Sequence, residues 1–267
     1  MAQLHSNFSF TGRLGNISAY KRKDSDKIIL RTKGGATKDR IKQAPEFDTT
    51  RRINAEFGGR SAGSKYIMQA LGSLKSLADY NIAGPLNALI KPIQAMDTES
   101  EYGRRNICFT KNPGLLDGFN LNQRNPFDSI VRNPLSSTIS KEDLSARIDI
   151  PALIPGINFF VPPGKYPLYS FMAVLNIVPD LFFDTYRYQP STNIQYLSKP
   201  IVSDWYPVLN GSPATTLETA MQIVGSIPAG ARFSIMLSVG IRFGTLGVNN
   251  EVQQVKNTGA AKISAMV

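Results

Sequence analysis

The chain has 267 residues, 42% of them hydrophobic, and a formal net charge of +10. This length and apolar fraction suffice for one large all-β domain or two smaller ones, and they exclude an intrinsically disordered chain. The single cysteine, Cys108, excludes a framework of internal disulfides. No apolar run has the length of a signal peptide or a membrane span, so we expect a cytoplasmic protein without a membrane span; export by a non-standard route stays open.

The positive charge is concentrated near the N-terminus. Residues 1–75 hold 15 Lys and Arg against 6 Asp and Glu, whereas the remaining residues hold 15 against 14. A basic segment on a nearly neutral body is typical of contact with phosphates, acidic lipids or an acidic protein face. A solvated basic surface has the same composition.

Residues 1–47 predict a basic hairpin arm and a connector that ends at Pro45. Two strands are expected within 8–33, joined by a charged turn at 23–26, because Asp and Ser side chains satisfy turn amides locally. A lone hairpin is marginal in water, so this one needs a surface to lie against. We expect inter-subunit contacts from Ile17, Tyr20, Ile28 and Leu30. We expect basic contacts from Arg13, Lys21, Arg22, Lys23, Lys27, Arg31 and Lys33.

Residues 48–104 predict a helical segment with two helices, at 48–79 and 82–97. In the first helix, apolar residues keep a helical spacing from Ile53 to Ala78. Its glycines at 58, 59 and 63 predict either a break or the close approach of another backbone, since each costs about 1 kcal/mol in a helix. In the second helix, Pro92 predicts a kink or an end.

Residues 105–267 predict an antiparallel β-sandwich or jelly roll, so the whole fold is mainly β with a small helical part. Strands are expected near 106–110, 146–153, 168–178, 181–188, 194–208, 217–227, 231–244 and 250–264. Between Phe233 and Phe243 apolar side chains alternate with polar or small ones, which predicts a strand with one buried face. Many short strands at this spacing are typical of a sandwich.

The patterns that carry enzyme chemistry are weak, so we expect no enzyme, no cofactor and no metal. The glycine-rich stretch at 58–66 lacks the Lys-Ser/Thr order and the preceding strand of a phosphate-binding loop. His5 and Cys108 are the only residues of their types, which excludes a tetrahedral zinc site of nitrogen and sulfur ligands within one chain. We expect the acidic cluster at 97–101 to form a solvated loop rather than a cation site. Nothing in the sequence singles out a pair of carboxylates.

Short pieces of the chain resemble a family of uncharacterised proteins from Bacteroidetes. They are Gly12-Arg-Leu-Gly-Asn16, Arg52-Ile-Asn-Ala-Glu-Phe-Gly58 and Leu115-Leu-Asp-Gly-Phe-Asn120. The resemblance implies no activity, cofactor or catalytic residue.

Three classes of function follow from these patterns. The first is a self-assembling structural subunit of a filament, tube or shell, whose partners are copies of itself. The second is a protein that binds or coats nucleic acid through its basic arm. The third is an adaptor or carbohydrate-binding module. Aromatic residues of the β part would line its sugar surface: Tyr166, Tyr169, Tyr186, Tyr188, Tyr196, Trp205 and Tyr206.

Overall fold

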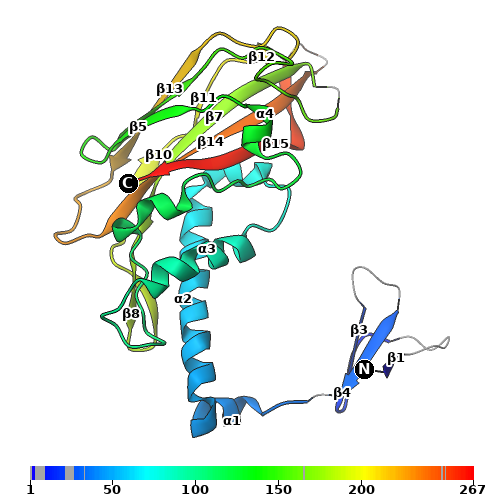
Figure 1. The fold of residues 1–267 in the computed structure, drawn as a ribbon, viewed down its shortest axis with the longest axis vertical. Helices are drawn as coiled ribbons and strands as arrows, with labels where there is room; N and C mark the ends of the chain where they lie inside the picture. The colour runs from blue at the N-terminus through cyan, green and yellow to red at the C-terminus, as the bar shows by residue number, and fades with distance from the viewer. Residues whose placement is uncertain are drawn as a thin grey trace. The chain divides into compact units, whose positions relative to one another are not determined.

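The structure is a computed structural model that describes residues 2–3, 10–21, 27–32, 34–164, 166–247, 249 and 251–267. The fold is mainly β with antiparallel sheets and few helices, as the sequence predicts (Figure 1). The chain divides into two compact units, Met1–Arg51 and Arg52–Val267. Each unit is therefore described separately.

The first unit begins with a small antiparallel sheet, called the N-terminal sheet below. Its strands are β1 (Ala2–Gln3), β2 (Gly12–Leu14), β3 (Ile17–Lys21) and β4 (Ile28–Thr32), in the order β1-β4-β3-β2. The predicted hairpin is confirmed as β3 and β4, although its turn lies outside the described residues. The incoming strand reverses once more at Gly15, whose φ of +54° suits glycine, and so forms two strands rather than one.

The basic connector is helical. It contains α1 (Lys38–Gln43) and the 3-10 helix η1 (Pro45–Phe47). Thr37 caps α1, because its hydroxyl accepts a hydrogen bond from the Arg40 backbone N–H at 3.3 Å. Arg51 donates to the carbonyls of Ile41 and Ala44, at 2.9 and 2.8 Å, and so holds the connector against the start of the next helix.

The helical segment forms α2 (Asp48–Ala70), the 3-10 helix η2 (Gly72–Leu77) and α3 (Ala83–Ala95). Of the two alternatives for the glycines of α2, a break is wrong, since the helix runs through them. What approaches Gly59 closely is the Tyr188 ring rather than a backbone. Pro92 does not end α3, which continues for three more residues. The predicted apolar stripe of α2 is buried only toward its C-terminus, because Ile53 and Phe57 are exposed.

Two sheets pack face to face in the second unit and form the predicted sandwich. One has the order β10-β13-β6-β5, from strands Tyr196–Ser198, Thr215–Ile223, Ser145–Ile150 and Ser136–Ser140. The other has the order β11-β7-β14-β15, from Ile201–Val202, Leu168–Pro179, Phe233–Leu246 and Val252–Met266; β12 (Tyr206–Pro207) also pairs with β7. Between them lies a core that includes Ile148, Leu217, Phe171 and Ile241.

The prediction that β14 has one buried face is wrong, because both of its faces are buried. Met236, on the face predicted to be open, belongs to a second core. That core joins β7, β14 and β15 to Ile67, Leu74 and Leu86 of the helices. Helices and strands of the second unit therefore form three layers: a smaller sheet, a larger sheet and a helical cover.

Some strand predictions need correction. Residues 106–110 form a single β-bridge at Ile107 followed by the 3-10 helix η3 (Phe109–Lys111), so a strand there is wrong. Residues 181–188 form the hairpin of β8 (Leu181–Asp184) and β9 (Arg187–Pro190), and residues 194–208 divide into three short strands.

Strand β5 is an element that the sequence analysis does not predict. The short helices η4 (Pro113–Leu116) and α4 (Phe127–Ile130) complete the fold. Among the described helices, none has both the length and the apolar character to cross a membrane.

Candidate functional site: the N-terminal sheet

The strand register places the predicted contact residues on two faces of the N-terminal sheet. Residues directly opposite each other on neighbouring strands project to the same face. Leu14 pairs with Ile17, Ala19 with Leu30, and Lys21 with Ile28. Ile17, Ala19 and Lys21 alternate along β3, so all of these side chains share one face. Tyr20 pairs with Ile29 and lies on the other face, apart from the residues with which the sequence groups it.

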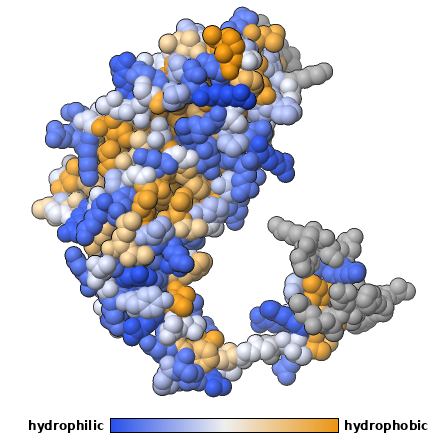
Figure 2. All heavy atoms as spheres, viewed as in Figure 1, coloured by the Kyte–Doolittle hydropathy of each residue, from blue (hydrophilic) through white to orange (hydrophobic). Residues whose placement is uncertain are grey.

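The first face, called the apolar face below, is made mainly of aliphatic side chains. Ala19 at its centre is buried, whereas Leu14 and Ile17 are 64% and 41% exposed. Ile28 and Leu30 are half-buried. Lys21 stands at the end of this face, opposite Ile28. Figure 2 shows hydrophobic and hydrophilic residues next to each other on this part of the chain.

The second face, called the basic face below, carries two arginines and an aromatic ring. Arg13 and Arg31 lie in one row across the strands, on either side of Ser18. The Arg31 guanidinium lies 5.8 Å from the centre of the Tyr20 ring, within the range of a cation–π contact. Arg13, Ser18 and Arg31 also line a pocket of about 330 Å³, together with Ile17 and Thr32 of the apolar face. The basic face therefore offers positive charge and an aromatic ring.

The remaining basic residues of the prediction are placed only in part. Lys27 is exposed and immediately precedes β4. Arg22, Lys23 and Lys33 lie outside the described residues, so the structure does not place them on either face.

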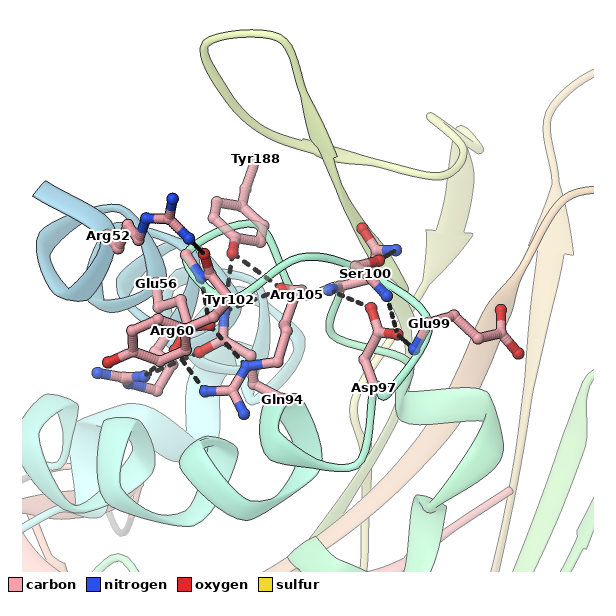
Figure 3. A network of polar contacts seen from close by, with 12 residues as sticks. Arg52, Glu56, Arg60, Gln94, Asp97, Glu99, Ser100, Tyr102, Arg105 and Tyr188 are labelled. Atoms are coloured by element: carbon pink, nitrogen blue, oxygen red, sulfur yellow. Dashed lines mark hydrogen bonds and ion pairs between the residues drawn. The ribbon is translucent and has the colours of Figure 1, made fainter. Parts of the chain in front are cut away.

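A network of polar side chains in the second unit is the other concentrated group of charges (Figure 3). Glu56 of α2 is only 3% exposed and accepts hydrogen bonds from Nε and Nη2 of Arg105, at 2.6 and 2.7 Å. The Gly103 N–H donates to the same carboxylate at 3.0 Å. Burial alone would raise the pKa of Glu56, but these hydrogen bonds and the charges of Arg105 and Arg60 outweigh it and hold the pKa below its usual range.

The network continues through α3 and the β8–β9 hairpin. Gln94 donates to the Arg105 carbonyl at 3.1 Å and to the Tyr188 hydroxyl at 2.9 Å, and accepts from Arg60 at 2.8 Å. The Tyr188 hydroxyl donates to the Arg105 carbonyl at 2.8 Å. Burial, together with the negative charge of Glu56, raises the pKa of Tyr188 to about 12. Each of these groups has a protein partner, so the network joins α2 and α3 to the Arg105 loop and to the β8–β9 hairpin.

Sequence reasoning missed this network, although one signal for it exists. Glu56 falls on the same helical face as Gly59, Gly63 and Ile67, which are all buried. A carboxylate at a buried helical position requires a cationic partner. The partner, Arg105, is 49 residues away along the chain, and no local pattern identifies it.

The acidic cluster at 97–101 closes a loop. The Asp97 carboxylate accepts hydrogen bonds from the backbone N–H groups of Glu99, Ser100 and Asn106, at 3.0, 3.1 and 2.7 Å. Burial would raise the pKa of Asp97, but hydrogen bonding from the Ser100 side chain and from these backbone groups outweighs it and keeps the pKa below its usual range. Glu101 forms an ion pair with Arg52 at 3.0 Å. No group of three or more potential metal ligands occurs within the described ranges.

The aromatic residues proposed for a sugar surface do not lie together on one exposed face. Tyr169 is fully buried, and Tyr166, Tyr196 and Tyr206 pack against the sandwich core. Tyr188 belongs to the polar network, and Tyr186 stands 90% exposed between β8 and β9. Trp205 stacks on Arg242 with 4.7 Å between the guanidinium and the ring.

Comparison with protein-family models, with curated proteins and with solved structures finds no match for this chain.

Proposed function

We propose that the chain is a non-enzymatic structural subunit that assembles with copies of itself, and that the N-terminal sheet makes the contact between subunits. The single observation that carries this proposal is the division of the sheet into an apolar and a basic face. The described strands of this sheet form one layer, and Leu14 and Ile17 at one end of its apolar face stay 64% and 41% exposed, so this part of the face needs another apolar surface to cover it.

A second copy of the chain is the partner that these faces favour. Two identical apolar faces complement each other when they stack, with Leu14 and Ile17 of one copy against the same residues of the other. Arg13 and Arg31 then remain on the outer surfaces, where their like charges stay in solvent. Such a symmetric contact closes at a dimer. A filament, tube or shell therefore also requires a second, different contact.

The test compares two substitutions at neighbouring positions of β3. Ile17→Lys places a charge on the apolar face, and Ser18→Lys places the same charge on the basic face. We expect Ile17→Lys to lower the native mass by at least half and Ser18→Lys to leave it unchanged. The measurement is light scattering with absorbance at two ultraviolet wavelengths. A wild-type monomer, or an Ile17→Lys variant with the wild-type mass, contradicts the proposal.

Nucleic-acid binding is the second candidate function, and the basic face is the observation that favours it. Arginines beside an aromatic ring can follow a phosphate backbone and stack on a base. Replacing Arg13 and Arg31 with Gln removes two possible phosphate contacts. The slope of log affinity against log salt should then fall in magnitude by about 1.4 for a generic single strand, since each phosphate contact contributes about 0.7. An unchanged slope, or no binding by the wild type at low salt, rejects this function.

A further inference from the structure

One end of the sandwich in the second unit carries an apolar groove of about 770 Å³, and none of its described lining residues is charged. Leu209 and Leu246 of this lining are 89% and 58% exposed. Figure 2 shows hydrophobic residues gathered at the end of the sandwich where Figure 1 labels β12. The lining includes Pro162, Tyr166, Leu168, Pro207, Leu209 and Leu246.

A neighbouring loop extends this apolar surface beyond the groove. Leu153 and Ser212 exchange backbone hydrogen bonds at 2.9 and 3.2 Å, which places the segment that follows Leu153 next to the loop of Leu209. In that segment Ile154 and Ile157 are 50% and 69% exposed. Large aliphatic side chains therefore gather at this end, whereas scattered single ones are what an ordinary surface carries.

The opposite end of the larger sheet carries the loop between β13 and β14, called the 224–230 loop below. Strand β14 runs from Phe233 to Leu246, so the loop before Phe233 and the groove at Leu246 are separated by about 43 Å of strand. All residues from Val224 to Gly230 are exposed, and none of them is charged. In Figure 1 this loop projects from the end of the sheet that lies away from β12.

The 224–230 loop is held in shape by its own hydrogen bonds. The Val224 N–H donates to the Gln195 carbonyl at 2.9 Å, and the Ala231 N–H donates to the Pro228 carbonyl at 3.1 Å. Gly225 has a φ of +90°, which glycine adopts without strain. Because the loop is already ordered, it loses little conformational entropy when it binds.

We infer that the groove of one copy of the chain takes up the 224–230 loop of the next copy, so that the second units join head to tail. Both surfaces are uncharged and carry exposed aliphatic side chains, one is hollow and the other projects, and they lie at opposite ends of one sheet. A contact between two different surfaces of the same chain continues from copy to copy and leads to a ring or a filament. The inference rests on the proposed self-assembly and supplies the second contact that a filament requires.

The test uses the Ile17→Lys variant as its background, because that substitution disables the apolar face of the N-terminal sheet and leaves the groove and the 224–230 loop intact. We expect the native mass of Ile17→Lys to rise with protein concentration. Adding Leu209→Asp in the groove, or Ile227→Asp in the loop, should hold it at the mass of one chain, since a carboxylate buried without a partner is costly. Light scattering over a range of concentrations measures these masses.

Mixing the two double variants tests the contact directly. The variant with Leu209→Asp keeps its loop, and the variant with Ile227→Asp keeps its groove. At a concentration where Ile17→Lys assembles, an equal mixture should therefore form pairs with the mass of two chains, although each variant alone stays a monomer. Leu246→Asp and Val224→Asp form a second pair for the same experiment, in case one substitution disturbs folding. Leu115→Asp is the matched control, because Leu115 is an exposed aliphatic residue of η4 outside both surfaces, and it should leave the mass unchanged.

The outcomes separate this inference from the proposed contact of the N-terminal sheet. If both mixtures stay monomeric, or if Ile17→Lys is a monomer at every concentration, the inference is overturned even where the wild type forms a dimer. Binding of Ile17→Lys to neutral lipid vesicles that Leu209→Asp abolishes would make lipid the occupant of the groove and would overturn it as well. If Ile17→Lys has the wild-type mass and the mixtures form pairs, the N-terminal contact fails and the head-to-tail contact stands.

Discussion

At the scale of single residues, the Glu56–Arg105 pair joins a buried carboxylate to a guanidinium that is largely removed from water. Its carboxylate is removed from water and receives three protein donors. Removing its charge would leave Arg105, which is only 24% exposed, without its anion. The loss of one partner of a buried pair is costly for this reason, whereas exposed pairs contribute little.

The substitution Glu56→Gln should therefore lower the free energy of unfolding by about 3 kcal/mol. Glu218→Gln makes the same chemical change at a carboxylate that is 69% exposed and pairs with Arg147. It should cost less than about 1 kcal/mol. Urea denaturation of both variants measures the difference. Equal losses would show that burial does not distinguish the two pairs.

The same pair predicts a pH dependence. The pKa of Glu56 is lower in the folded chain than in the unfolded chain, where it is about 4.3. Its stabilising contribution is therefore complete above that value and is lost as the pH falls through the lower, folded pKa. The stability difference between the wild type and Glu56→Gln should shrink as the pH is lowered from about 5 to about 3. A difference that is constant over this range contradicts the assignment.

At the scale of elements, two adjacent glycines of α2 stand in opposite environments. A Cβ on Gly59 would lie 2.7 Å from ring atoms of Tyr188, whereas a Cβ on Gly58 would meet no atom within 4 Å. The Tyr188 ring cannot easily retreat, since its hydroxyl is held by Gln94 and by the Arg105 carbonyl. Sequence alone shows only two glycines in a helix and does not distinguish them.

Alanine at these two positions should change stability with opposite signs. Gly58→Ala should stabilise the protein by about 0.5–1 kcal/mol, because alanine loses less backbone entropy in a helix. Gly59→Ala should destabilise it by about 1–3 kcal/mol, as overpacking typically does. Thermal unfolding of the two variants compares them directly. A stabilised Gly59→Ala variant would mean that Tyr188 does not pack on the helix.

Strand β14 shows which structural features an alternating sequence pattern predicts and which it does not. The alternation in β14 correctly predicts a strand, and its apolar set does face the sandwich core. Its other set contains Ser234, Ser238 and Gly240, which are typical of a solvent face but are buried. A Cβ on Gly240 would lie 2.6 Å from Leu74. Alternation with a period of two residues predicts the strand itself. The helical layer that packs on the strand depends on contacts between segments that are far apart in the sequence, and the alternation does not reveal them.

The N-terminal sheet follows the same rule at the candidate site. The register places Ile17, Ala19, Ile28 and Leu30 on one face, as the alternation of side chains along each strand requires. Tyr20 directly follows Ala19 in β3, so its side chain projects to the opposite face of the sheet. The extra reversal at Gly15 brings Leu14 beside Ile17 and adds a residue that the simple hairpin does not include.

At the scale of the whole molecule, both hydrophobic cores belong to the second unit, and their residues all lie at or beyond Ala62. Deleting residues 1–35 removes the strands of the N-terminal sheet and none of these core residues. The shortened chain should therefore keep a cooperative unfolding transition, with a Tm within about 3 °C of the wild-type value. This comparison requires protein dilute enough that assembly does not raise the wild-type Tm.

The same deletion should lower the native mass by at least half at high protein concentration, as Ile17→Lys does, because it removes the apolar face. Calorimetry and light scattering on one preparation then separate folding from association. A normal Tm with the wild-type number of subunits would place the subunit contact outside residues 1–35. A lost or broadened transition would mean that the N-terminal strands contribute to the fold of a single chain, and the apolar face would then be covered within that chain rather than by a neighbouring copy.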